Sequence, residues 1–469
     1  MARRLHRPLS PDLFRPPQRR QGESRTPIPG ATGKVTALVL FGISLVLLLS
    51  YRPSSRDPLP LLRLAGTAVL GATGLYLLSV HFLHSHRRAF RRTRRILPVF
   101  LFSLLVLGLA KLACHVEGWP PFLLPVSLAS LLFTISMGRQ ASFDLTVVLY
   151  GLLALSLASE TPELFGRPVA HTLVVLAPGA LLGVIFGERV RKRSTLIELG
   201  LGVGAANAFA LAAITLAAGD ASAWASPALH AELLWAFGHG LAVGLVLTGL
   251  LPAIEVAFEV TTDIRLLELS TLHHPLLQAL SIRAPGTYHH SLLVGQLAEA
   301  AAEAVGANGL LCRVGAYYHD IGKVIRPGFF VENGFYYEIL HSRLSPGMSS
   351  LVILAHVKDG LELARLHRLP EPIVEVIQQH QGVGTLDLFY RKALEELGPR
   401  AVDRGRFSYP GPLPQSLEVG IVALADSVEA AYRYLSEPSP EAVKKAVKKA
   451  IQRKIDEGLL DDAPMTLRQ

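Results

Sequence analysis

The feature that most constrains this chain is a series of long apolar segments within its first 258 residues. Eight segments reach about 17 residues or more, the helix length needed to cross a bilayer core of roughly 30 Å. They span residues 35–51, 61–83, 96–116, 120–137, 141–158, 170–187, 197–218 and 231–258. Charged residues make up only 18% of the chain and the mean hydropathy is +0.37, so we predict a polytopic helical membrane bundle over residues 35–258.

Basic residues alternate between the loops that join these segments. Lys and Arg are frequent in the tail (1–34) and after the second, fourth and sixth segments, whereas the intervening loops are poor in both. Because loops rich in Lys and Arg remain in the cytoplasm, we predict that both termini are cytoplasmic. The same placement explains the net charge of +9 without a DNA or RNA polymer as partner.

The N-terminal tail, residues 1–34, is rich in Arg and Pro and is predicted to be disordered. The first apolar segment is not expected to be a cleaved signal peptide, because no small-residue cleavage site follows it.

Few ionisable residues interrupt the later segments. Glu232 and His239 lie in the last one, and we expect them at headgroup level or satisfied within the bundle. No pair of broken helices indicates a transporter.

After residue 258 the composition changes, and helical periodicity replaces continuous apolarity. Apolar residues recur at helical spacing in 291–305, 346–367, 370–380 and 416–435, and no segment has a convincing strand pattern. We therefore predict a linker over 259–285 and an all-helical domain over 286–469. The fold class is all-α throughout.

Histidines and aspartates recur on or beside the helices of this second part. The six residues concerned are His290, His319, Asp320, His356, His380 and Asp426. Asp426 lies in the apolar sequence VALADSVEA, where an unpaired buried carboxylate is unfavourable, so a positive partner is expected. Four imidazoles and two carboxylates suit two divalent metal ions, most naturally Mn²⁺ or Fe²⁺, with Zn²⁺ also acceptable.

Two such ions can activate a water molecule and neutralise both oxygens of a phosphoryl displacement. The adjacent pair His319-Asp320 supplies neighbouring ligands without a long loop, and Asp320 is predicted to bridge the ions. The chain has two cysteines, Cys114 and Cys312, which offer neither a disulfide framework nor a CxxC zinc motif.

The ordered pattern H…HD…H…H…D resembles that of the HD-domain metal phosphohydrolases. The segments GTYHHS (286–291), YYHDIGK (317–323), FFVENG (329–334) and ADSVEAAYR (425–433) are similar to those of the seven-transmembrane HD family, the PgpH-type cyclic di-AMP phosphodiesterases of bacteria. This resemblance covers roughly residues 60–465. It implies hydrolysis of cyclic di-AMP to the linear dinucleotide pApA.

The resemblance also implies roles for individual residues. The six histidines and aspartates would be the metal ligands, Asp320 would bridge, and Lys323 would lie near the phosphate or steady Asp320. The chain departs from the family at Gln381, where members carry a second histidine, and at His341, whose neighbours differ from the family's NPHD. Gln381 and His341 are predicted substrate contacts. The family's large extracellular domain is replaced between the first two segments by RPSSRDPLP.

Alternatives remain at this point. The enzyme could act on another cyclic or linear nucleotide, although the HHExxDGxGYP signature of the cyclic di-GMP branch is absent after His380, where the chain reads QGVGTLDLF. The domain could instead be degenerate, binding a nucleotide and signalling through the membrane. The bundle would sense a signal or only anchor and dimerise the enzyme in the lipid bilayer. The predicted location is the bacterial inner membrane, with the HD domain in the cytoplasm.

Overall fold

A computed structural model gives the structure of the protein. It describes Gly42 and residues 96–469, apart from 117–118, 120–121, 159–162, 165–166, 191, 220, 335, 436 and 467–468. The described residues form two compact units that meet in the sequence between Ile264 and Arg265. The predicted tail and the apolar segment 61–83 lie outside the described residues, as does segment 35–51 apart from Gly42.

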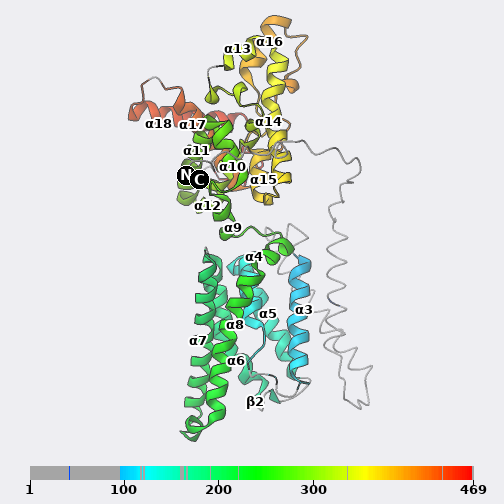
Figure 1. Ribbon diagram of the computed structural model, residues 1–469, viewed down its shortest axis with the longest axis vertical. Helices are drawn as coiled ribbons and strands as arrows, with labels where there is room; N and C mark the ends of the chain where they lie inside the picture. The colour runs from blue at the N-terminus through cyan, green and yellow to red at the C-terminus, as the bar shows by residue number, and fades with distance from the viewer. Residues whose placement is uncertain are drawn as a thin grey trace, which may run out of the picture. The chain divides into compact units, whose positions relative to one another are not determined.

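The first unit is a bundle of apolar helices, several of which run side by side in Figure 1. Its helices are α3 (Ile96–Ala113), α4 (Val126–Met137), α5 (Arg139–Ala158), α6 (Val169–Phe186), α7 (Arg193–Ala217) and α8 (Pro227–Phe258). Two short 3-10 turns, Gly187–Arg189 and Ala221–Ala225, lie between them. Four of the helices, α5 to α8, are long and apolar enough to cross a membrane. Each of the six predicted segments that falls in the described residues thus contains a helix, whereas eight spans are not established.

Helix α4 is shorter than the predicted segment 120–137. It has 12 residues and begins only after Pro125, so it is about 18 Å long at 1.5 Å per residue. Proline lacks a backbone N–H and disfavours helix before it, which explains why the helix starts late after Pro120, Pro121 and Pro125. The chain turns from α4 to α5 at Gly138, whose φ is +82°.

A minimal strand pair interrupts the otherwise helical architecture. Residues Glu163–Leu164 (β1) and Arg167–Pro168 (β2) pair antiparallel between α5 and α6. The expectation of no strand pattern concerned only the chain after residue 258, so this pair lies outside it. Four residues in a loop between two helices carry no period that sequence patterning could detect.

Helices α7 and α8 pack at close range through facing glycines. A Cβ atom added to Gly240 would lie 2.1 Å from the backbone nitrogen of Gly204, and one added to Gly200 would lie 2.6 Å from the carbonyl oxygen of Gly240. Small residues at four-residue spacing let membrane helices approach until their backbones touch. The spacing Gly200–Gly204 on α7 and Gly240–Gly244 on α8 therefore fixes this helix pair.

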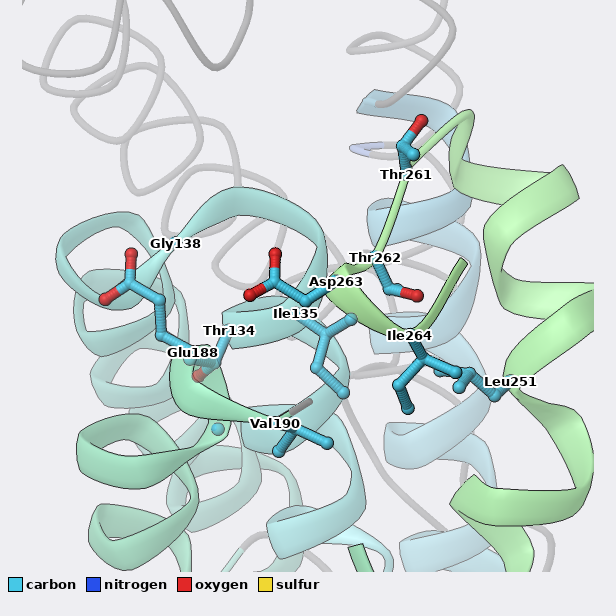
Figure 2. Close-up of a pocket in the computed structure, with 11 residues that line it drawn as sticks. Thr134, Ile135, Gly138, Glu188, Val190, Leu251, Thr261, Thr262, Asp263 and Ile264 are labelled. Carbon is cyan, nitrogen blue, oxygen red and sulfur yellow. The ribbon is translucent and has the colours of Figure 1, made fainter. Parts of the chain in front are cut away.

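Three turns meet at one end of the bundle, around a cavity of about 180 Å³. Its walls come from the turn after α4, the turn after α6, helix α8 and the connector 261–264 that follows α8. Figure 2 shows the carboxylates of Glu188 and Asp263 pointing the same way, away from Val190 and Leu251. Thr262 donates a hydrogen bond to Glu255, which ties the connector to the last turn of α8.

The second unit is all-helical. Its helices are α9 (Asp263–Leu269), α10 (Pro275–Arg283), α11 (Pro285–Val305), α12 (Gly309–Tyr318), α13 (Tyr337–Ser342), α14 (Pro346–Leu366), α15 (Glu371–Gln379), α16 (Asp387–Leu397), α17 (Leu417–Arg433) and α18 (Pro440–Asp456). Four 3-10 turns join them: η5 (Ile321–Ile325), η6 (Pro327–Phe329), η7 (Val331–Asn333) and η8 (Arg404–Phe407).

Most of the predicted linker 259–285 is part of this unit. Helices α9 and α10 bury Leu266, Leu276 and Leu280 in one hydrophobic cluster with Tyr318 and Ile321. The Tyr318 hydroxyl donates to the carbonyl of Leu269, 2.8 Å away, which joins α12 to the end of α9. The segment therefore supports the helix that ends at the HD pair.

Candidate metal centre

The six predicted ligands come together from five helices or helix ends of the second unit. His290 lies in α11, His319 and Asp320 directly follow α12, His356 lies in α14, His380 follows α15 and Asp426 lies in α17. Ligand atoms of His290, His319 and Asp426 lie within 4.8 Å of one another, as do those of His319, Asp320 and His380. Residues up to 136 positions apart in the sequence thus form one cluster.

Asp320 lies at the centre of this cluster, and its two oxygens face different histidines. Oδ2 lies 3.1 Å from His319 Nε2 and 3.7 Å from His290 Nε2. Oδ1 lies 3.2 Å from His356 Nε2 and 3.6 Å from His380 Nε2. The carboxylate therefore divides the four imidazoles into two pairs, which is the arrangement that a bridging ligand requires.

The glycine of the HDIGK sequence allows this approach. A Cβ atom on Gly322 would lie 1.9 Å from the carbonyl oxygen of His356 and 2.5 Å from the nitrogen of Gly360. Any side chain at residue 322 would therefore push η5 away from α14. Glycine is needed here for space, because it lets Asp320 reach His356.

Backbone carbonyls orient three of the four histidines. Nδ1 of His319 lies 2.7 Å from the carbonyl of Ala316, and Nδ1 of His356 lies 2.7 Å from that of Ile353. His380 Nδ1 lies 3.0 Å from the carbonyl of Ile377. A carbonyl only accepts, so each Nδ1 carries the proton and each Nε2 presents its lone pair to the cluster.

The fourth histidine is held by a carboxylate instead. His290 Nδ1 lies 2.7 Å from Glu429 Oε2, and Arg433 donates to both oxygens of Glu429 at 2.6 and 2.8 Å. Burial alone would lower the pKa of His290, but its hydrogen bonds to Asp426 and Glu429 raise it to about 9. Sequence reasoning assigned no role to Glu429. A usable signal was its position three residues after Asp426 on the same face of α17.

Lys323 has two carboxylate partners. Its Nζ lies 2.6 Å from Asp320 Oδ2 and 2.8 Å from Glu332 Oε1. Glu332 also accepts from the Thr287 hydroxyl at 2.9 Å, so η7 and the start of α11 are linked through it. Of the two roles predicted for Lys323, this geometry corresponds to steadying Asp320. Glu332 was missed, because FFVENG shows no pattern that marks a lysine partner.

The electrostatics keep the carboxylates ionised. Burial opposes ionisation of Asp320, but the neighbouring His319 and Lys323 hold its pKa well below the usual range. Burial likewise opposes ionisation of Asp426, and the hydrogen bond from His290 lowers its pKa. Burial lowers the pKa of His380 and favours its neutral form. Ionised carboxylates and neutral imidazoles are the forms that bind metals.

A further observation indicates that these donor atoms suit divalent metal ions. Nε2 of His319, His356 and His380 and Oδ1 of Asp320 are buried and have no hydrogen-bond partner in the described part of the chain. Buried polar atoms are normally satisfied, and leaving several unpaired in one cluster is unfavourable. Nitrogen and oxygen donors that converge in this way suit Mn²⁺, Fe²⁺ or Zn²⁺.

In the described contacts, Gln381 reaches the cluster through Asp426, one of the predicted ligands. Its Nε2 donates to Asp426 Oδ2 at 3.3 Å. The resemblance described above predicts a second histidine at this position. An amide that donates to Asp426 orients that carboxylate and leaves Gln381 outside the set of strong donors.

His341, the other predicted substrate contact, is surrounded by aromatic rings. Its Nε2 lies 3.0 Å from the carbonyl of Phe329, and its ring packs against Phe329, Tyr337 and Phe389. No contact joins His341 to the cluster within the residues that the structure describes. Its role toward a substrate stays a prediction, while its contacts are those of a buried packing residue.

Two family models match the chain in succession. The model described as a 7TM receptor with intracellular HD hydrolase matches residues 61–262, and the HD domain model matches residues 287–431. The first range contains seven of the eight predicted apolar segments, and the second contains all six proposed ligands. The chain is thus a membrane protein with an HD domain.

Curated relatives agree with these matches. The cyclic-di-AMP phosphodiesterase PgpH of Bacillus subtilis is 35% identical over 353 residues, which is 74% of this chain and 48% of the relative. The Listeria monocytogenes protein of the same name is 34% identical over 348 residues, 74% of this chain and 47% of the relative. This chain therefore spans about half the length of the curated relatives it matches.

A solved structure is also similar. It contains the HD domain of the L. monocytogenes phosphodiesterase PgpH in complex with cyclic-di-AMP. The two are 42% identical, the match covers 42% of this chain and 90% of that chain, and the TM-score is 0.40.

Proposed function

Because this chain belongs to the family of seven-transmembrane proteins with an intracellular HD hydrolase domain, we propose that it is a membrane-anchored, metal-dependent phosphodiesterase that hydrolyses cyclic di-AMP to pApA. The observation that carries the proposal is the division of four imidazoles into two pairs by the oxygens of Asp320. Curated relatives that bear the name of this activity support the choice of substrate.

The proposed ligands form two sets that share Asp320. His290, His319 and Asp426 lie on the side of Oδ2, and His356 and His380 lie on the side of Oδ1. Two divalent ions, Mn²⁺ or Fe²⁺, would neutralise phosphate charge and lower the pKa of water when bound. The protein's own residues hold the donors in place, since backbone carbonyls fix the tautomers of His319, His356 and His380, and Lys323 holds Asp320.

Other parts of the proposal concern the surroundings of the site. Gln381 and His341 are proposed to face the substrate, with Gln381 acting beside Asp426. The protein would lie in the inner membrane of a bacterium with both termini and the HD domain in the cytoplasm, and the bundle would anchor and dimerise it. These assignments follow from loop charge and from the family relationship.

The test uses the full-length protein in lipid nanodiscs, loaded with Mn²⁺. Cyclic di-AMP, cyclic di-GMP and 3′,5′-cyclic AMP are incubated with it separately, and chromatography follows the products. We expect a linear dinucleotide from cyclic di-AMP alone. Asp320→Ala should lower the rate by about a thousandfold or more and remove bound metal, because both metal sites lose a shared ligand. Asp387→Asn is the matched control, since Asp387 is half-buried and pairs with Arg453, outside the cluster.

The outcomes separate the alternatives. If a different nucleotide is cleaved, the proposed substrate is wrong, but the protein is still a hydrolase. If two metal ions are bound and none of the nucleotides is cleaved, the protein is a nucleotide-binding signalling protein, and the departure at Gln381 becomes the first explanation to test. Equal activity of Asp320→Ala and the control would contradict the proposed metal centre itself.

A further inference from the structure

The membrane unit contains a second, apolar cavity of about 220 Å³. It lies between α3, the segment that leads into α4, and the middle of α8. Its walls include Leu109, Trp119, Leu124, Leu128, Val243 and Val246. Apart from His239 and Trp119, all described lining residues are apolar. Walls of this kind favour contact with the apolar body of a ligand.

His239 is the exception in this wall. It is only 2% exposed, and its Nε2 has no hydrogen-bond partner among the described residues. The sequence led us to expect His239 at headgroup level or satisfied within the bundle, but it lies twelve residues into α8, about 18 Å from the start of the helix. The indole N–H of Trp119 already donates to the carbonyl of Leu123 at 3.3 Å.

We propose that this cavity binds a neutral amphiphile whose apolar body fills it and whose single hydroxyl pairs with His239 Nε2. An unpartnered imidazole nitrogen in an apolar wall is unfavourable unless a ligand satisfies it. A hydroxyl both donates and accepts, so it pairs with either tautomer of the ring. A charged ligand is disfavoured, because the described wall offers no charged partner.

The site lies on α8, a helix that contributes no residue to the proposed metal centre. Helix α8 is the last helix of the membrane unit before the HD unit in the sequence, and His239 lies in its middle. The proposed ligand thus binds within the membrane, on a helix that the hydrolytic proposal does not use. Binding is measured directly and needs no nucleotide.

The experiment uses quenching of Trp119 fluorescence in full-length protein in nanodiscs. Trp224→Phe and Trp235→Phe leave Trp119 as the only tryptophan of this chain. Bromooctanol and bromooctane, which share a body and differ in the hydroxyl, are titrated separately. We expect saturable quenching by bromooctanol at a concentration about tenfold lower than by bromooctane, which is the effect of one hydrogen bond.

Two variants connect this preference to His239. In His239→Leu the difference between the probes should disappear, and in His239→Gln, which keeps a polar group, much of it should remain. Equal quenching of the unsubstituted site by both probes would mean that any hydrocarbon chain fills the cavity. Quenching that only rises linearly would mean partition into lipid, with the cavity filled by another part of the chain. Either result overturns the proposal, and neither depends on how the His239 variants fold.

Discussion

Glu429 orients the ring of His290, which is one of the six proposed metal ligands. Its carboxylate lies 2.7 Å from Nδ1 of the ring and is itself held by Arg433. Glu429→Gln removes the negative charge while keeping the shape, so the ring is less firmly oriented and less basic. Changes of this kind lower metal affinity by about 10- to 100-fold. Titration of the metal-free protein with Mn²⁺ measures the effect.

Glu299→Gln is the matched control for this prediction. Glu299 also lies in the second unit and pairs with an arginine, Arg313, at 2.9 Å, but it touches none of the six ligands in the described contacts. The control should bind Mn²⁺ as the unchanged protein does. If Glu429→Gln bound Mn²⁺ equally well, the carboxylate would have only a packing role.

A substitution at Gln381 should have the opposite effect and strengthen metal binding. Gln381→His places an imidazole next to Asp426, where the amide now donates at 3.3 Å. We expect the variant to retain more Mn²⁺ after dialysis, because an imidazole nitrogen is a strong ligand and an amide is a weak one. Metal content by elemental analysis checks this. Unchanged metal content and rate would mean that the departure from the family pattern at this residue has no consequence.

That these six side chains form one cluster was predictable, because the sequence leaves few alternatives for them. His319 and Asp320 are adjacent within a short motif, and Asp426 interrupts an apolar helical face. Glu429 and Glu332 were not predictable in the same way. Each acts through another side chain, His290 or Lys323, and only the folded structure brings these partners together across 139 or 9 positions.

At the scale of elements, α10 begins at a histidine whose protonation opposes the fold. The side chain of His274 accepts from the N–H of Leu276 at the start of the helix. Burial lowers its pKa from 6.5 to about 4, helped by the charges of His367 and Arg265. Because the unfolded chain then binds the proton more tightly, this site favours the fold above about pH 6.5 and loses that contribution as the pH falls toward 4.

The variant His274→Asn tests this linkage. Asparagine keeps a side-chain acceptor at the helix start and does not titrate, so the loss of thermal stability between pH 7 and pH 4.5 should be smaller than in the unchanged protein. His273→Asn, at the exposed neighbouring residue, should retain the original pH dependence. Melting temperatures of the full-length protein at both pH values measure the difference. If the melting temperature fell by the same amount between the two pH values in all three proteins, the prediction would be wrong.

Elements were predictable to the extent that their periodicity is long and uninterrupted. Helices α14 and α17 follow the amphipathic pattern over many turns, and their predicted bounds agree closely with the structure. The start of α4 and the pair β1–β2 were not predictable, because prolines and short loop pairings act locally without a period. The helices within 259–285 were missed because α9 has seven residues and α10 nine.

At the scale of the whole molecule, three connections of the bundle lie at the same end. The turn at Gly138, the turn at 187–190 and the connector 261–264 line one cavity, so they share one end of the bundle. Two of them follow the fourth and sixth apolar segments, whose loops are basic. From these loop charges we predict that this end of the bundle faces the cytoplasm.

The two ends of helix α7 provide the sharpest test of which end of the bundle faces the cytoplasm. It is preceded by the basic residues of ERVRKRS and followed by a loop, 218–226, that contains neither Lys nor Arg. With 25 residues it is long enough to cross the bilayer, so its two ends should lie on opposite sides. Cysteines introduced at exposed Lys192 and Ala225, one at a time in a Cys114→Ala and Cys312→Ala background, report the side of each end.

In intact cells a membrane-impermeant maleimide should label Ala225→Cys and should label Lys192→Cys only after the membrane is permeabilised. The parent without cysteines controls for background labelling. The reverse pattern would place the end of α8, and with it the start of the HD unit, outside the cell, where it could not meet a cytoplasmic nucleotide. Labelling of both positions from one side would mean that α7 does not cross the membrane, in conflict with its length and apolar composition.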